Sequence, residues 1–305
     1  MIKSEIENKD YRLGILLSVF GALLLSTKGI FAKILYDNGA DYESVTVVRA
    51  ILSIPLFWTW YFMRRKKAIQ SIPKHNLFII LSAGFIAYYF GALVNFYALT
   101  MIDANIERLI LYSFPAIVIV FKSFQEKTMP SKNMVLILLV IYLGLFLAVG
   151  IGNQTLIMKN FYGGLLVFIS TITVSIYFLL NEKYGQEIGS ITFTTIAMTG
   201  ATVGLFVHAL VRNNLNWMTW SPEMWINMLM LVLVATTIPL FMVAEGIKRS
   251  GASASALGTT IAPPSTIFFA WLILGETLEA TQIIGCLMVL FGIIILQRSA
   301  SDRIS

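Results

Sequence analysis

Four charged residues lie inside apolar runs that are long enough to cross a membrane: Lys28, Arg49, Glu107 and Arg108. A charge near the bilayer centre costs about 2.5–3.5 kcal/mol on insertion scales, so residues of this kind need a partner or a function. Three cations and one anion leave a surplus of positive charge, which suits a carboxylate or a phosphate in a site of low dielectric constant. We therefore predict that Lys28 and one of the arginines bind an anionic group of a ligand.

A structural interpretation of the same charges is the alternative. Glu107 would pair with Arg49 or Arg108, and the long cationic side chains would reach the outer headgroups. With a rise of 1.5 Å per residue, both arginines lie roughly 8 Å inside the outer ends of their runs and Lys28 roughly 12 Å inside, so all could share one layer. Glu107 is also the candidate carrier for proton coupling, because a carboxylate among apolar residues favours its protonated form, although neighbouring cations oppose this.

Uncharged polar residues recur at three- and four-residue steps in two of the runs, which places them on one face of each helix. These residues are Tyr88, Gly91 and Asn95 in one run, and Ser170, Thr173, Tyr177 and Asn181 in the other. Such a face contacts protein or water, and the alternative to ligand binding is interhelical hydrogen bonding, worth about 0.6 kcal/mol per bond. The predicted substrate-binding set is Lys28, Arg49, Tyr88, Asn95, Glu107, Arg108, Tyr112, Tyr177 and Asn181.

The composition is that of a membrane protein. Apolar residues make up 57% of the 305 residues, charged residues only 12%, and the mean hydropathy is +0.80. The net charge of +6 does not indicate a nucleic-acid partner, because the basic residues lie between the apolar runs. The single cysteine, Cys286, excludes a disulfide within the chain and a cysteine metal cluster. We expect no cofactor and no metal.

The apolar runs must position these residues, and ten of them have about the 20 residues that a helix needs to cross a bilayer. They cover residues 13–35, 43–63, 76–99, 104–122, 133–152, 161–181, 190–211, 223–245, 252–274 and 280–297. Most Lys and Arg residues outside the runs fall on one side of this arrangement, which predicts that both termini are cytoplasmic. The expected cytoplasmic tails are residues 1–12 and 298–305.

Two parts of the chain resemble each other. Residues 248–296 contain a proline-interrupted helix, an acidic turn and an apolar helix, and residues 106–150 form a looser copy. The repeats, 13–152 and 161–297, would hold five spans each, and an odd number inverts the second copy in the membrane. Pro115, Pro263 and Pro264 should interrupt their helices and free backbone carbonyls. We expect these breaks to line the pathway as gates; the alternative is a kink needed only for packing.

The chain carries a set of short motifs along its whole length, at Lys33, Arg49, residues 106–111 with Pro115, 188–190, 237–239, 251–252, Pro263, 274–276 and Gly285. In these motifs the sequence resembles the ten-span EamA-type branch of the drug/metabolite transporter superfamily. The chain departs from the family pattern at residues 25–28, which read Leu-Ser-Thr-Lys. The resemblance implies an all-α membrane fold of two inverted five-helix repeats around a central cavity, and export of small metabolites.

The predicted function is a secondary transporter, an exporter that moves an amino acid, an organic acid or a similar metabolite across the cytoplasmic membrane by alternating access. A facilitative channel and, less favoured, a membrane enzyme or scaffold are the alternatives. The sequence has no GxxxxGK[ST] loop for ATP and no HExxH or Ser/His/Asp set, so we expect no enzyme activity. Gly200 and Gly204 form a small-residue face that predicts close packing within the chain or a homodimer contact.

Overall fold

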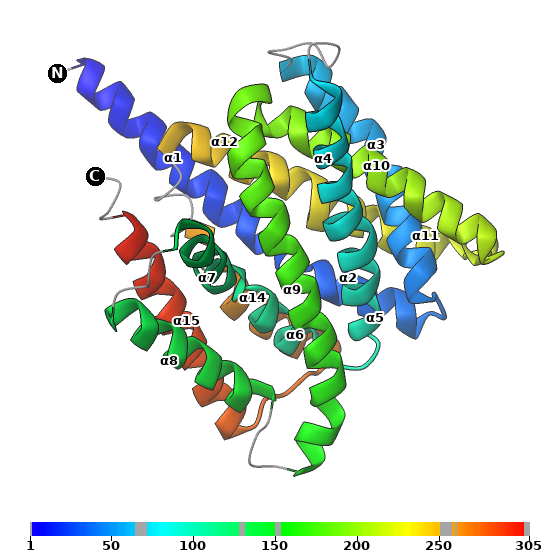
Figure 1. The fold of residues 1–305 in the computed structure, drawn as a ribbon. Coiled ribbons are helices and arrows are strands. Elements are labelled where there is room, and N and C mark those ends of the chain that lie inside the picture. The colour runs from blue at the N-terminus through cyan, green and yellow to red at the C-terminus, as the bar shows by residue number, and fades with distance from the viewer. Residues whose placement is uncertain are drawn as a thin grey trace.

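The computed structural model is helical and contains no strand within the residues it describes, which are 2–64, 72–127, 132–149, 154–250, 258–259 and 261–301 (Figure 1). Eight helical segments are long and apolar enough to cross a membrane, and two further apolar helices are shorter. The eight are Tyr11–Asp37, Tyr42–Met63, Lys74–Ala98, Ala104–Gln125, Lys132–Val149, Asn160–Gly185, Ile191–Val211 and Pro222–Val243, and the shorter two are Ala262–Leu274 and Ala280–Ile295. The first part of the expected ninth span lies outside the described residues.

The expected first span, residues 13–35, lies within the membrane-length segment Tyr11–Asp37, and it consists of two helices. Helix α1 (Ile2–Leu25) ends before Ser26, and α2 (Lys28–Asp37) begins after Thr27. The hydroxyl of Ser26 donates to the Leu23 carbonyl at 2.6 Å, and that of Thr27 donates to the Leu24 carbonyl at 2.7 Å. Hydroxyl side chains that bond to nearby backbone carbonyls compete with regular helix hydrogen bonds and bend helices.

The remaining helices follow in chain order. In the first half they are α3 (Tyr42–Arg64), α4 (Lys74–Gly84), η2 (Phe85–Gly91), α5 (Ala92–Ala98), α6 (Ala104–Leu111), α7 (Phe114–Glu126) and α8 (Lys132–Val149). In the second half they are α9 (Gln154–Ile188), α10 (Ser190–Val211), η3 (Asn216–Thr219), α11 (Pro222–Val232), η4 (Leu233–Thr237), α12 (Ile238–Ser250), α14 (Ala262–Phe269), η5 (Ala270–Leu274) and α15 (Ala280–Ser301).

Two of the spans are built alike. Helices α4 and α11 each have 11 residues, and each continues directly into a π-helical turn, η2 and η4, and then into a further α-helix. A π turn inserts an extra residue into an α-helix and is found most often near functional sites. The two halves of the chain therefore share this departure from regular geometry in their third helical span.

The predicted prolines stand at the starts of helices. Span four is interrupted between α6 and α7, and Pro115 lies in the first turn of α7. Pro263 and Pro264 lie in the first turn of α14. The chain that precedes α14 includes residues 251–257 and 260, which are outside the described residues. The interruption of span four thus agrees with the expected effect of a proline, whereas the gating role stays a prediction.

Close helix pairs join the two halves. Helix α1 packs against α12, α3 against α10, α6 against α14, and α8 against α15, while α9 packs against η2 and α5 (Figure 1). Glycines lie at these crossings: a Cβ on Gly285 would collide with the Gly144 carbonyl, and one on Gly21 would press on Pro239 and Val243. Gly200 and Gly204 of α10 face Leu81 and Phe85 within the same chain. Small residues allow membrane helices to approach this closely.

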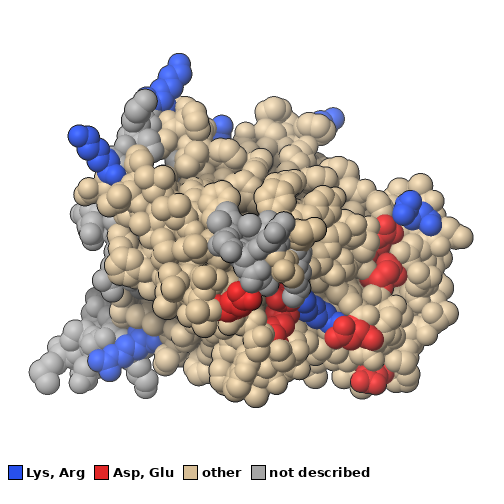
Figure 2. All heavy atoms as spheres, turned by 90° about the horizontal axis from the view of Figure 1, so that it is seen from below, with Lys and Arg blue, Asp and Glu red and all other residues tan. Residues whose placement is uncertain are grey.

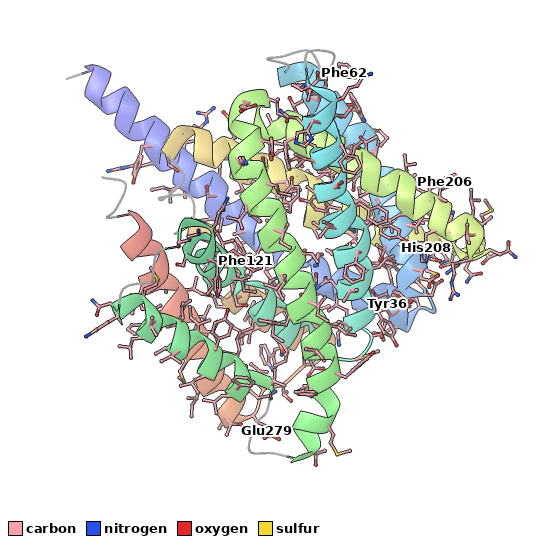
Figure 3. The ribbon with its side chains drawn as sticks, viewed as in Figure 1. Tyr36, Phe62, Phe121, Phe206, His208 and Glu279 are labelled. Carbon is pink, nitrogen blue, oxygen red and sulfur yellow. The ribbon has the colours of Figure 1, made fainter. Side chains whose placement is uncertain are left out.

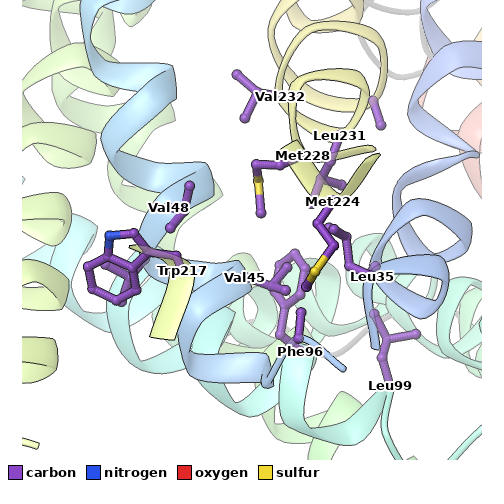
Figure 4. Close-up of a cluster of buried hydrophobic side chains, with 14 of the residues drawn as sticks. Leu35, Val45, Val48, Phe96, Leu99, Trp217, Met224, Met228, Leu231 and Val232 are labelled. Atoms are coloured by element: carbon purple, nitrogen blue, oxygen red, sulfur yellow. The ribbon is translucent and has the colours of Figure 1, made fainter. Parts of the chain in front are cut away.

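Apolar side chains pack between the helices and also cover their outer surfaces. Figure 4 shows one buried cluster, in which Phe96 lies near Leu35, Val45 and Met224. Large apolar residues of α8 and α15, among them Leu136, Phe146, Leu287 and Phe291, are more than half exposed. A surface of this kind needs lipid rather than water around it, and the chain is a multi-pass membrane protein.

Candidate functional site

The break in the first span places Lys28 at the start of α2, where it joins a buried hydrogen-bonded triad. The Lys28 ammonium donates to Asn95 Oδ1 at 2.8 Å and to Glu107 Oε1 at 3.1 Å, and Asn95 Nδ2 donates to the same Glu107 oxygen at 2.9 Å. Glu107 is 0% exposed, and the Lys28 side chain is 17% exposed. Glu107 therefore pairs with Lys28, which corrects the alternative prediction that it pairs with Arg49 or Arg108.

The two arginines lie around this triad without a carboxylate. Arg49 is 6% exposed and Arg108 5% exposed, and neither forms an ion pair with an Asp or Glu among the described residues. The Arg49 guanidinium lies 5.0 Å from the centroid of the Phe96 ring, and Lys28 Nζ lies 5.4 Å from the same centroid. The Arg108 guanidinium lies 5.9 Å from the Tyr112 ring. Aromatic faces stabilise cations, but they carry no counter-charge.

Backbone carbonyls freed by the break face the same region. Arg108 Nη2 donates to the Leu25 carbonyl, and Thr266 of α14 donates to the Ser26 carbonyl at 3.0 Å. Within the described part of the chain, several buried polar atoms nevertheless have no hydrogen-bond partner: Arg49 Nε, Arg108 Nε, Glu107 Oε2 and Thr237 Oγ1. Buried polar groups are almost always hydrogen-bonded. Arg49, Glu107 and Arg108 therefore present unused donors and an unused acceptor, which makes the charged cluster the candidate site.

The other predicted site residues are divided between two places. Tyr112 lies under Arg108, and its hydroxyl donates to the Thr259 carbonyl of the second half at 3.4 Å. The Tyr88 and Tyr177 rings lie 4.9 Å apart, and the Tyr177 hydroxyl bonds with Thr194 at 2.8 Å. Asn181 is further along α9, and no contact among the described residues joins it to Lys28. Tyr88 and Tyr177 thus form a separate aromatic pair, and the structure does not bring Asn181 to Lys28.

Two residues at the cluster are absent from the predicted set. Phe96 is apolar, and Thr266 is an isolated hydroxyl residue of the second half. Phe96 adjoins Asn95 in sequence, which is the one signal that could have drawn attention to it. The polar stripe of α9, by contrast, is used partly for packing, because Ser170 donates to the Gly91 carbonyl at 2.9 Å.

A second group of charged residues lies at the end of the molecule where α2 and α5 end. Glu276 Oε1 accepts a hydrogen bond from the backbone N–H of Ala104 at 2.9 Å, and Oε2 accepts one from that of Asn105 at 3.3 Å. Lys33 Nζ lies 3.0 Å from Glu276 and 3.8 Å from Asp103. The carboxylate thus caps the N-terminus of α6, where the helix dipole favours an anion. We call Lys33, Asp103, Glu276 and the start of α6 the end latch.

The end latch borders an open cavity of about 610 Å³, lined in part by Lys33, Leu99 and Glu276. Figure 2 views the molecule from this end and shows Asp and Glu side chains gathered near its middle. Figure 3 shows Tyr36 and Glu279 toward this end and Phe62 at the opposite one. Glu276 therefore forms a contact between the two halves of the chain.

A neighbouring rim cluster ties α3 to α10 and the segment after it. The hydroxyl of Tyr89 lies 2.9 Å from His208 Nδ1, and His208 is seen on α10 in Figure 3. Asp41 accepts hydrogen bonds from the Ser44 hydroxyl at 2.6 Å, from the Ser44 N–H at 2.8 Å and from Asn214 at 2.9 Å. Burial raises the pKa of Asp41, but these hydrogen bonds stabilise the carboxylate. Together they hold the pKa of Asp41 below its ordinary value.

Acid should weaken this rim cluster. Because the folded-state pKa of Asp41 is lowered, its carboxylate stabilises the fold above its unfolded pKa of about 3.9, and the contribution is lost as pH falls through the folded value. Asp41→Asn should lower Tm by about 1–3 °C at pH 7, and the difference should shrink as pH falls below about 3.9. Thermal unfolding from pH 7 to pH 3 measures this. Asp37→Asn, at an exposed neighbour, is the control; a difference for Asp41→Asn that does not change with pH would contradict the assignment.

Known proteins resemble the whole chain. The model of the EamA-like transporter family matches residues 12–150 and 161–298. The Bacillus subtilis (strain 168) protein named Uncharacterized transporter YcbK is 29% identical over 284 residues, with 92% of this chain and 91% of that protein covered. An uncharacterized transporter of Archaeoglobus fulgidus is 22% identical over 281 residues, which is 91% of this chain and 95% of that protein.

The fold has a counterpart among solved structures. A crystal structure at 14% sequence identity superimposes with a TM-score of 0.65 and covers 96% of this chain and 98% of its own. That likeness concerns the fold alone, whereas the family match extends over both halves of the chain and confirms the resemblance found in the sequence. The chain belongs to the EamA-like transporter family and is a membrane transporter.

Proposed function

We propose that this transporter is a secondary transporter that exports a small organic anion, such as an organic acid or an acidic amino acid, by alternating access. The observation that carries the proposal is the buried cluster around Lys28, in which Arg49 and Arg108 have no carboxylate partner among the described residues. Guanidinium groups bind carboxylates and phosphates through paired N–H donors. An anionic substrate supplies the missing charge.

The proposed architecture is ten spans in two inverted repeats. In this arrangement the first span, with α1, corresponds to the sixth, with α9, and the third span, with η2 and α5, corresponds to the eighth, with α12. An internal twofold axis then relates the contact of α1 with α12 to the contact of α9 with η2 and α5. The pairs α3–α10, α6–α14 and α8–α15 each join two corresponding spans, so the axis maps each pair onto itself. All of these pairs occur, and η2 and η4 take equivalent places. This pattern supports an inverted repeat with the substrate near the middle of the membrane.

The proposed orientation puts both termini in the cytoplasm. The end that carries Asp37, Asp41, Asp103 and Glu276 would face outward, and the basic segment 64–67 would face inward, in keeping with the positive-inside bias. In this orientation the end latch closes the outer side. Release of substrate outward then requires the latch to open, and Pro115, Pro263 and Pro264 are the proposed flexible points of the broken helices.

A thermal-shift screen tests whether the cluster binds anions. Purified protein would be heated with acetate, lactate or glutamate and with their uncharged amides at equal ionic strength. A ligand present at 100 times its Kd stabilises the folded state by about 2.7 kcal/mol, which is a rise of several degrees in Tm. We expect the anions alone to raise Tm. Lys28→Arg should keep the effect, and Lys28→Ala should lose it because Glu107 without Lys28 would itself repel the anion. Equal shifts with the amides would reject the proposal.

A further inference from the structure

The charges of the buried cluster do not cancel. Lys28 and Glu107 form a neutral pair at 3.1 Å, and Asn95 completes their hydrogen bonds. Arg49 and Arg108 add two positive charges, each more than nine-tenths buried, with no ion-pair partner among the described residues. Both arginine charges act on Lys28, so each arginine lies within electrostatic range of that ammonium. Removing a charge from water without a partner is unfavourable.

The arginine donors are also largely unused. A guanidinium has five N–H donors. Arg49 makes no hydrogen bond to the described residues, and Arg108 gives one to the Leu25 carbonyl. That carbonyl belongs to the C-terminal end of α1, which carries only about half of a negative charge. Neither a backbone dipole nor the Phe96 and Tyr112 rings can therefore balance two full positive charges.

We propose that the substrate carries two negative charges at neutral pH, as a dicarboxylate or a phosphate monoester does. Arg49 and Arg108 each bind an anionic oxygen of this dianion, and Lys28 stays paired with Glu107. A monoanion would leave one guanidinium uncompensated, and a zwitterion would leave both. This inference rests on the proposed function and narrows its substrate class.

Matched ligand pairs test the charge of the substrate. Succinate would be compared with succinamate, and methyl phosphate with dimethyl phosphate, at pH 7.5 and equal ionic strength, with Kd taken from thermal shift or calorimetry. In each pair one member is a dianion and the other a monoanion of similar size. We expect at least one dianion to bind at least tenfold more tightly than its monoanion. If only succinate binds more tightly than its monoanion, the substrate is a dicarboxylate. If only methyl phosphate does, the substrate is a phosphate monoester.

Substitutions test which residues cause the preference for a dianion. Arg49→Gln and Arg108→Gln should each reduce the preference for the dianion to less than threefold. Arg212→Gln removes a cation whose side chain is 64% exposed on the rim, and it should leave the preference unchanged. Equal binding of both members of each pair would overturn the dianion while leaving anion transport in place. If no anion binds at all, the proposed function fails as well.

A measurement without ligand gives an independent result. If Arg49 is an uncompensated buried charge, Arg49→Gln should melt at a higher temperature than the parent protein in the absence of anions. The same substitution should lower Tm relative to the parent at saturating dianion. A lower Tm without ligand would show that Arg49 stabilises the fold by itself, and it would overturn the proposal.

Discussion

Replacing Glu107 with leucine is expected to cause the largest loss of stability of any single substitution in the buried cluster. The substitution removes the only negative charge from the triad and leaves Lys28 in range of Arg49 and Arg108. Breaking a buried pair by removing one partner costs about 3–5 kcal/mol, because the remaining charge is buried without compensation. Unfolding of the purified protein in detergent, by heat or by denaturant, measures the loss.

A double-mutant cycle separates the charge from the packing. Lys28→Met combined with Glu107→Leu removes both members of the pair and should recover most of the stability lost in Glu107→Leu. Glu107→Gln should fall between Glu107→Leu and the parent protein, because an amide can still accept from Asn95. If the losses of Lys28→Met and Glu107→Leu simply add in the double variant, then the 3.1 Å pair contributes nothing to stability.

Replacing Glu276 with glutamine is expected to open the end of the transporter that carries the end latch. The substitution removes the anion from the start of α6 and breaks the 3.0 Å contact with Lys33. A loss of about 1–2 kcal/mol from the closed state changes the open population by a factor of about 5–30. Leu99 is 1% exposed and borders the cavity beside the latch, so Leu99→Cys in a Cys286→Ser background should react with an impermeant maleimide faster by about that factor.

Glu223→Gln is the matched control for this experiment. Glu223 is an exposed carboxylate in the first turn of α11, and its replacement makes the same change of charge without touching the end latch. The labelling rate of Leu99→Cys should therefore not change with Glu223→Gln. An equal rate in the Glu276→Gln background and in the parent would mean that the latch does not hold this end closed.

Much of the fold could be predicted from the sequence because apolar runs of membrane length are a strong local signal. Asn95, Glu107 and Lys28 were all in the predicted set, and the structure joins them. Their pairing could not be predicted. Lys28 and Glu107 are 79 residues apart, and which cation reaches the carboxylate depends on how α2 and α6 pack.

The break in the first span was the main feature that the sequence analysis missed. Ser26 and Thr27 immediately precede Lys28, and two adjacent hydroxyl residues in an apolar run can divert helix carbonyls. Depth counted along one straight helix therefore does not apply to Lys28. Asn181 was included in the predicted set because it follows Tyr177 by four residues and so lies on the same face of α9. Helical spacing gives the face of a helix, but it does not give the position along the helix at which a site lies.

The π-helical turns have a geometric consequence for the cluster. One inserted residue rotates everything after it by about 100° around the helix axis. Asn95 follows η2 within one turn, so the direction of its amide toward Lys28 and Glu107 depends on that insertion. Each π turn begins directly after an 11-residue helix, so a matching insertion sets the direction of the residues that follow it in both places.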